Sequence, residues 1–364
     1  FNFETMRMEL ISFSELIFNP VAQVKFVHTV SAGYVTGAIF VLAISSYYML
    51  KKRDFPFARR SFAIAAAFGL ASTLSVIVLG DESGYEIGDV QKVKLAAIEA
   101  EWETEPAPAG FNIIAFPNQE EMKNDFAIKI PYVMGIIATR SLDKEVTGLK
   151  DLMANHEARI RNGMVAYGLL QKLKAGDKSE HILAEFKSRQ KDLGYGLLVK
   201  KYAPDVVNAT ETHIQAAVKD SIPRVAPLFW SFRVMVLCGF SMLLLMVLAV
   251  YAVVKRNIEN RTKLLKFALY SLPLPWIAAQ TGWIVAEYGR QPWTIGEVLP
   301  THLSASSISS GDIWGSILTL MVFYTVLLII EMYLMVKFCK LGPSSLHTGK
   351  YHFETQNNTT IIKE

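Results

Sequence analysis

Long runs of apolar residues alternate with more polar segments along this chain. A helix needs about 20 such residues to cross roughly 30 Å of hydrocarbon. Five runs are long enough and are bounded by charges or helix-breaking residues, and none has the short core and cleavage site of a secretory signal peptide. We therefore predict an all-α membrane bundle with five transmembrane helices, at about Val21–Leu50, Ser61–Gly80, Pro227–Val254, Leu264–Ala286 and Ile313–Phe338.

Composition supports a membrane protein. Of 364 residues, 51% are hydrophobic and only 19% are charged, which is unusual for a soluble domain. The two cysteines belong to different predicted spans, Cys238 within the third and Cys339 at the very end of the fifth, and are interpreted as apolar packing residues. The net charge of +4 comes mainly from short loops, so it bears on membrane orientation and gives no reason to expect nucleic acid as a partner.

The charges of the short loops orient the spans. The links KKRDFPFARR and KRNIENRTKLLK are strongly basic, which places them in the cytoplasm. Alternation of the spans then places the long segment 81–226 in the periplasm. The predicted parts are a lead-in with two spans (1–80), the periplasmic segment (81–226), three spans (227–339) and a cytoplasmic tail (340–364) that ends in a disordered TQNNTTIIKE.

Two helices are expected in the periplasmic segment. The stretch DVQKVKLAAIEAEWETEPAPAG predicts a short helix stopped by Pro106 and Pro108. The stretch GLKDLMANHEARIRNGMVAYGLLQKLKAG has the periodicity of an amphipathic helix and should end at Gly176.

Polar and sulfur-bearing residues inside spans are candidates for function. His28 on the first span and Met235 on the third stand at similar depths near the outer face. Imidazole and thioether are the ligand pair that holds a low-spin haem iron. Arg233 could meet a haem propionate, and Lys25 could do the same or extend to the interface. The alternatives are a hydrogen-bonded core histidine and a methionine that fills a gap, since the chain has 13 methionines.

A carboxylate stands at the outer end of the fourth span. Glu287 could ligate iron, accept protons or simply pair with Arg290 one turn later. Upstream, Pro273 and Pro275 should kink the span and free backbone carbonyls that other groups must satisfy.

The early part of the periplasmic segment carries a candidate site for a hydroquinone. Lys94 and Glu99 lie five residues apart in KLAAIEAEW, which puts them on roughly adjacent faces of a helix. A cation and a proton acceptor beside Trp102 would suit hydroquinone oxidation at the membrane surface. The competing interpretation is a solvated charged face.

Four motifs together resemble a known family. The chain is similar, from Phe1 to at least Phe353, to subunit I of cytochrome bd-type quinol oxidases. The motifs that carry the resemblance are GRQPW, KLAAIEAEWET, GDESGYE and FRVMVLCGF.

The resemblance implies a role for each candidate residue. His28 and Met235 would be the axial ligands of haem b558, with Arg233 stabilising that haem. Glu287 would be an axial ligand of a high-spin haem, assigned as haem b595. Lys94 and Glu99 would bind quinol in the periplasmic segment, which the family calls the Q loop.

The resemblance also implies an overall reaction and partners. Ubiquinol or menaquinol would be oxidised at the Q loop, and its electrons would pass through haem b558 to haems b595 and d, where O2 becomes water. The proton gradient would arise without pumping. Expected partners are subunit II, small single-span subunits and the lipid bilayer of the bacterial inner membrane.

One departure from the family stands out. Members have nine spans in this subunit, and the five predicted here correspond to the last five. Because the chain opens with Phe1 and not Met, we expect a fragment that lacks the first four helices. Those helices carry a histidine ligand and acidic residues of the proton route, so this chain alone should be inactive in oxygen reduction.

Two other functions use the same residues. A transporter or channel would line a substrate path with Glu287, Arg233 and the broken proline-containing helix. A non-catalytic haem-binding anchor that relays electrons would need His28 and Met235, but neither Glu287 nor the long outer segment.

Overall fold

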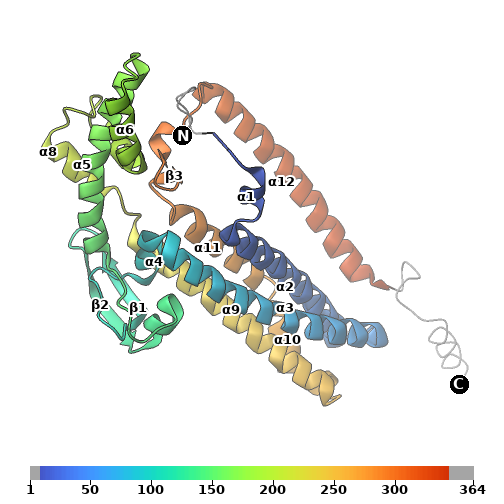
Figure 1. Ribbon diagram of the computed structural model, residues 1–364. Helices are drawn as coiled ribbons and strands as arrows, with labels where there is room; N and C mark the ends of the chain where they lie inside the picture. Colours follow the sequence, from blue (N-terminus) through green and yellow to red (C-terminus); the bar gives the residue numbers. More distant parts are fainter. Residues whose placement is uncertain (1–8, 344–364) are drawn as a thin grey trace, which may run out of the picture. The chain divides into compact units, whose positions relative to one another are not determined.

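The computed structural model describes residues 9–343. Four helices in this part of the chain are long and apolar enough to cross a membrane (Figure 1). They match four of the five predicted spans and extend most of them by a few residues: α2 (Pro20–Leu50), α3 (Phe55–Val90), α9 (Val225–Val254) and α12 (Ser310–Leu341).

The predicted fourth span is not one continuous helix. It is broken into α10 (Thr262–Tyr270) and α11 (Leu274–Tyr288). The break falls at Pro273, which lacks the backbone N–H that a continuing helix needs and whose ring would clash with the preceding turn. The proline kink expected from the sequence is therefore a full interruption, and the described part of the chain has four continuous long apolar helices instead of five.

The chain divides into two compact units. Unit 1 comprises the chain up to Val30, Ser75–Cys238 and Ile277–Ala305. Unit 2 comprises Ser31–Leu74, Gly239–Trp276 and the chain from Ser306.

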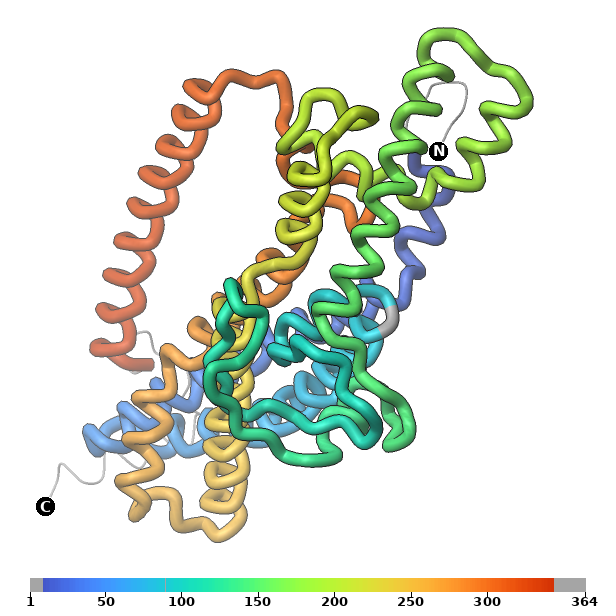
Figure 2. The backbone as a smooth tube through the Cα atoms, turned by 90° about the vertical axis from the view of Figure 1, so that its left-hand side faces the viewer, coloured from blue at the N-terminus to red at the C-terminus, as the bar shows by residue number. Residues whose placement is uncertain are grey.

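Unit 1 contains two small antiparallel sheets, so the all-α prediction is wrong in this part. Strands β1 (Phe111–Asn118) and β2 (Lys123–Ile130) form a hairpin, whose backbone is drawn in teal in Figure 2. Strand β3 (Trp293–Ile295) pairs with β4 (Leu299–Pro300). The hairpin strands are rich in isoleucine and phenylalanine, which fit a pleated surface. The remaining elements of unit 1 are helical: α1 (Phe13–Ile17), α4 (Lys92–Glu99), η1 (Gly135–Thr139), α5 (Leu149–Lys174), α6 (Glu180–Arg189), η2 (Gln190–Asp192), α7 (Leu193–Leu198), η3 (Val199–Lys201), α8 (Glu211–Lys219) and η5 (Thr301–Leu303).

Two helix ends in unit 1 test the sequence predictions. Helix α4 ends at Ala100, which adopts a left-handed conformation, and so stops before the predicted terminators Pro106 and Pro108. Helix α5 ends close to the predicted Gly176, whose φ of 102° only glycine adopts readily. The amphipathic pattern located α5 correctly, while the end of α4 is set by a single backbone conformation.

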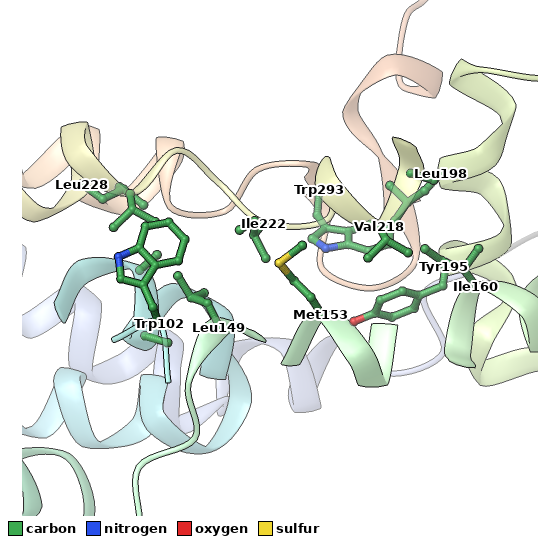
Figure 3. Close-up of a cluster of buried hydrophobic side chains, with 14 of the residues drawn as sticks. Trp102, Leu149, Met153, Ile160, Tyr195, Leu198, Val218, Ile222, Leu228 and Trp293 are labelled. Atoms are coloured by element: carbon green, nitrogen blue, oxygen red, sulfur yellow. The ribbon is translucent and has the colours of Figure 1, made fainter. Parts of the chain in front are cut away.

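The core of unit 1 joins the hairpin, α4, α5, α7, α8 and the loop that carries β3 (Figure 3). Helices α5 and α7 touch through glycines: a Cβ on Gly163 would lie 2.1 Å from the Asp192 carbonyl oxygen and 2.4 Å from the Gly196 nitrogen. Only glycine permits this approach. Tyr195 of α7 in turn packs edge-on against Trp293, with ring centroids 5.1 Å apart.

Unit 2 is built by close helix packing, and it also contains the short η4 (Ile258–Asn260). A Cβ on Gly69 would lie 2.5 Å from the Met246 methyl and 2.9 Å from the Ala38 methyl, so small residues let the helices approach. Helix α12 has no buried residue, and Arg53 donates hydrogen bonds of 2.6 and 2.8 Å to the carbonyls of Lys340 and Leu341 at its end. From residue 344 on, the predicted cytoplasmic tail lies outside the described residues.

Candidate functional site

The short helix α4 buries both candidate quinol-site residues. Lys94 is 4% exposed and Glu99 is 3% exposed. Their neighbours Ala96 and Ala97 are fully packed in the core of unit 1, which brings the helix backbone close to the surrounding elements. The alternative of a solvated charged face is therefore excluded. A buried charge is costly unless partners compensate it, so the partners define what this helix can do.

Lys94 lies against the end of α11. Its Nζ donates a hydrogen bond of 2.9 Å to the carbonyl of Ala286, and a Cβ on Gly289 would lie 3.0 Å from Lys94 Cε. Burial and the positive charge of Lys25 lower the pKa of Lys94 to about 8, with Glu287 acting in the opposite direction. Lys94 can therefore exchange a proton near physiological pH, which an exposed lysine cannot do.

Glu99 faces α9 and forms a buried ion pair. Arg233 Nη2 lies 2.7 Å from Glu99 Oε2, and the two side chains are 12% and 4% exposed. Burial raises the pKa of the Glu99 carboxyl, while the adjacent Arg233 guanidinium opposes this shift. Arg233 is two residues from Met235 on the same helix, so the pair connects α4 directly to the helix that carries the predicted thioether ligand.

Arg233 has further partners beside Glu99. It donates hydrogen bonds to the backbone carbonyl of Asn112 and, at 3.3 Å, to that of Ile98. Its guanidinium also stacks over Phe229 at 4.1 Å and Phe111 at 4.7 Å from the ring centroids. The guanidinium is thus held in a fixed position by protein acceptors, and a haem propionate would have to share it with Glu99.

His28 and Met235 each face a glycine. A Cβ on Gly80 would lie 3.4 Å from His28 Cε1, and a Cβ on Gly282 would lie 3.0 Å from the Met235 sulfur. His28 Nδ1 is buried and has no hydrogen-bond partner among the described residues. Low-spin haem iron is commonly held by an imidazole nitrogen and a thioether sulfur. The unpartnered His28 nitrogen and the Met235 sulfur, which lies next to a glycine, are donors of these two types. That both bind one iron stays a prediction.

Glu287 pairs with Arg290 three residues later, which is one of the alternatives the sequence left open. The ion pair lies beside Lys94, whose pKa responds to both charges. Ligation of a high-spin haem iron by Glu287 stays a prediction. The candidate residues are thus joined in two groups, Lys94 with Glu287 and Arg290, and Glu99 with Arg233.

Sequence reasoning missed a second buried carboxylate. Glu101 is 2% exposed and hydrogen-bonds Asn112 of β1, while Lys129 of β2 contacts it from the other side. Glu101 was visible as the last acidic residue of EAEW, but its partners lie on a hairpin that the sequence did not predict. The signal in the sequence that could have identified Glu101 is its position two residues after Glu99, the candidate proton acceptor.

A second missed cluster lies where α5 and α7 meet the loop before α12. His156 Nδ1 hydrogen-bonds Ser221 Oγ at 2.8 Å and stacks on Tyr195. Burial and Arg159 lower the pKa of His156 to about 4, so the imidazole is neutral. Arg159 lies over the Tyr195 ring and pairs with Glu297 at 2.9 Å. These contacts fix the loop that follows α11, and they are interpreted as structural.

Comparison with known proteins identifies the family. Residues 1–343 match the family described as cytochrome bd terminal oxidase subunit I. The chain is 50% identical over 348 residues to the cytochrome bd-II ubiquinol oxidase subunit 1 of Escherichia coli (strain K12), covering 96% of this chain and 68% of that protein. It is 28% identical over 343 residues to the cytochrome bd ubiquinol oxidase subunit 1 of Bacillus subtilis (strain 168), covering 94% of this chain and 61% of that protein.

A solved structure has the same fold. The bd oxidase of Geobacillus thermodenitrificans superposes with a TM-score of 0.65 at 20% sequence identity, covering 94% of this chain and 63% of that one. The chain therefore spans between about three fifths and two thirds of the length of these relatives. Its long apolar helices and its family make it a multi-pass membrane protein. On the match over nearly its whole length, the chain belongs to the cytochrome bd terminal oxidase subunit I family.

Proposed function

We propose that this chain forms the quinol-oxidising part of a cytochrome bd-type oxidase of the bacterial inner membrane. The observation that carries the proposal is the burial of Lys94 and Glu99 on one short helix, each held by a different partner helix. The chain provides a hydrogen-bond donor and a proton acceptor in apolar surroundings, which is what the oxidation of a hydroquinone needs. Both relatives described above are named ubiquinol oxidase subunits.

The two residues have different roles in this proposal. Lys94, with a pKa of about 8, binds and orients one oxygen of the quinol through its ammonium group. Glu99 accepts a hydroxyl proton, and its raised pKa makes the protonated form accessible. Arg233 positions Glu99 and stabilises its ionised form between turnovers. The surrounding core, including Trp102, excludes water from the donor and the acceptor.

The proposal includes the cofactors and their ligands. His28 and Met235 would hold haem b558, and Glu287 would ligate a high-spin haem assigned as b595, with haem d in the complete oxidase. When bound, these groups would supply one-electron transfer and the reduction of O2 to water. The fit rests on donor chemistry: His28 has an unpartnered buried Nδ1, and Met235 has a glycine against its sulfur.

The proposal also fixes an orientation and partners. The Q loop, residues 81–226, faces the periplasm and the carboxy-terminal tail faces the cytoplasm. Protons from quinol are released outside while protons for water are taken from inside, so a gradient forms without pumping. Subunit II and small single-span subunits complete the assembly within the lipid bilayer. The quinol would be ubiquinol or menaquinol.

The experiment replaces Lys94 and compares it with a matched lysine. Lys94→Gln is introduced into the complete oxidase, with Lys92→Gln as the control because Lys92 is exposed on the same helix. We expect Lys94→Gln to lower quinol-dependent oxygen uptake and to raise the KM for quinol, while haem content stays at the wild-type level. Lys92→Gln should behave like wild type. Equal turnover in all three proteins would remove Lys94 from the quinol site.

A haem-binding electron relay without catalysis is the second candidate. It would use His28 and Met235 but would have no need for two buried ionisable residues on α4. The Lys94 experiment separates the two functions, because a pure relay would keep its haem spectrum and would show no quinol-dependent effect of the substitution.

A further inference from the structure

The buried carboxylate of Glu101 has no role in the function proposed above. At 2% exposure it is as deeply buried as Glu99, two residues away. Three charged groups face it: Lys129 from β2, Glu105 from the segment after α4, and Glu99 from α4 itself. Glu101 therefore carries a desolvation cost that has to be offset, and its surroundings indicate what it can do.

Asn112 of β1 links Glu101 to Glu99. Its Nδ2 donates two hydrogen bonds of 2.9 Å, one to Glu101 Oε1 and one to the backbone carbonyl of Glu99. The backbone carbonyl of the same residue accepts a hydrogen bond from Arg233, which pairs with Glu99. One asparagine thus holds both glutamates in a fixed relation. Its Oδ1 is buried without a partner among the described residues, so it remains available to a proton donor.

The other oxygen of Glu101 points toward the surface of unit 1. Lys129 Nζ lies 3.3 Å from Glu101 Oε2 and also pairs with Glu105. The side chains of Lys129 and Glu105 are 36% and 24% exposed, against 3% for Glu101. Two contacts, Glu101 with Lys129 and Lys129 with Glu105, therefore connect a buried carboxylate to side chains that are partly exposed to water.

Hydroquinone oxidation creates a need for such a chain. Each quinol loses two protons and two electrons, and both O–H bonds break as two carbonyls form. A single carboxylate held by an arginine can take only one proton, and it must release that proton before it accepts the next. Efficient proton acceptors have a pKa near the working pH. Burial, opposed by Lys129 and reinforced by Glu105 and Glu99, raises the pKa of Glu101 to about 7.

We propose that Glu101 is a proton-relay residue that takes the protons released at Glu99 and delivers them to water at the Lys129–Glu105 pair. The inference rests on the proposed quinol function and extends it by naming the outward proton path. Both protons of each quinol leave by this path, and both electrons go to the haem iron of the oxidase as the one-electron acceptor. Glu101 does not touch the quinol.

A purely structural role for Glu101 would have different consequences. In that case the carboxylate would only fasten the hairpin to the end of α4 through Asn112. Glutamine could replace it at little cost, since its amide oxygen can accept the same hydrogen bond. A relay, in contrast, requires a group that ionises, which glutamine cannot do.

The test is the pH dependence of quinol-driven haem reduction in the complete oxidase. Glu101 must be ionised to accept a proton, so we expect the wild-type rate to rise with pH through about 7. Glu101→Gln should lower the rate at neutral pH by about tenfold or more and abolish this rise. Glu103→Gln is the control, because the Glu103 side chain is 72% exposed and pairs with Lys150 at the surface.

Two neighbouring substitutions give a signature that a structural role would not produce. Lys129→Met removes the cation that lowers the pKa of Glu101, so the rise should move to higher pH. Glu105→Gln removes a carboxylate that raises this pKa, so the rise should move to lower pH. These opposite shifts decide the proposal even if Glu101→Gln fails to assemble. A wild-type pH profile in both variants would overturn it.

The outcomes distinguish this inference from the proposed function. If Glu99→Gln slows haem reduction by quinol while Glu101→Gln keeps the wild-type rate and profile, only the relay is wrong. If Lys94→Gln and Glu99→Gln also keep the wild-type rate, the quinol site itself is misplaced. Haem content and the spectrum reduced by dithionite report assembly in every variant.

Discussion

The two units bury different kinds of polar residues. Among the described residues, the buried polar side chains of unit 2 are all hydroxyls: Ser31, Ser45, Ser46, Ser72, Thr73 and Ser271. Unit 1 buries Lys94, Glu99, Glu101 and His156. Every buried lysine, glutamate and histidine in the described part of the chain therefore belongs to unit 1.

The hydroxyls of Ser72, Thr73 and Ser271 in unit 2 are satisfied within their own helices. Thr73 donates to the carbonyl of Gly69 at 2.7 Å, and Ser271 donates to that of Phe267 at 2.6 Å. Such i to i−4 bonds need no other element. The charged groups of unit 1 depend on partners far away in sequence, as when Glu99 meets Arg233 across 134 residues. Unit 2 is consistent with a packing scaffold, and unit 1 contains the groups that can transfer protons.

The largest expected effect concerns the predicted haem ligands of unit 1. We expect His28→Ala or Met235→Leu to abolish the low-spin b-type absorption band of the complete oxidase, because each removes one axial ligand. Met242→Leu is the matched control, since Met242 is a buried methionine of the same helix in unit 2. Reduced-minus-oxidised spectra of the purified protein give the result. An unchanged band in Met235→Leu would remove that residue from the ligand set.

The next effect tests how strongly unit 1 depends on its buried ion pair. Arg233→Met leaves the Glu99 carboxylate buried without its partner, which typically costs about 3–5 kcal/mol. The double variant Arg233→Met with Glu99→Gln should recover part of this loss. In unit 2, Thr73→Val removes a helix-internal hydrogen bond and should cost about 1 kcal/mol. Thermal unfolding of the purified protein compares the three, and equal losses for Arg233→Met and Thr73→Val would contradict the distinction.

A smaller effect compares glycines in the two units. Gly163→Ala forces a methyl group to within 2.1 Å of a backbone oxygen of the α7 region, so it should cost about 1–3 kcal/mol through overpacking. Gly37 of α2 has no atom within 4 Å of an added Cβ among the described residues, so Gly37→Ala should leave stability nearly unchanged. The midpoints of thermal unfolding check both. A larger loss for Gly37→Ala would show that its face is covered in the complete oxidase.

Much of the fold could be predicted because it depends on local patterns. Apolar runs located α2, α3, α9 and α12, and amphipathic periodicity located α5. The hairpin β1–β2 was missed because its short strands are stabilised by tertiary contacts, such as the hydrogen bond of 3.0 Å from Trp102 Nε1 to Asn124 Oδ1. The break between α10 and α11 was underestimated, since the sequence indicates a kink at a proline but not how far the chain departs from a helix.

The candidate site was predictable as residue types but not as an arrangement. The sequence predicted that Lys94 and Glu99 lie on one helix and that Arg233 could interact with a haem propionate. Only the fold brings Arg233 to Glu99, because α4 and α9 meet through long-range packing. Glu101 was overlooked for the same reason: burial distinguishes it from the exposed Glu103, and neighbouring sequence letters do not encode burial.

The central claim is that the buried groups of α4 are where quinol gives up its protons. Rapid mixing of the complete oxidase with quinol tests it most directly, with Glu99→Gln compared to wild type. We predict that haem reduction by quinol becomes about a hundredfold slower in Glu99→Gln, while dithionite reduces the same haems to the same extent. Reduction by quinol at the wild-type rate in this variant would contradict the claim.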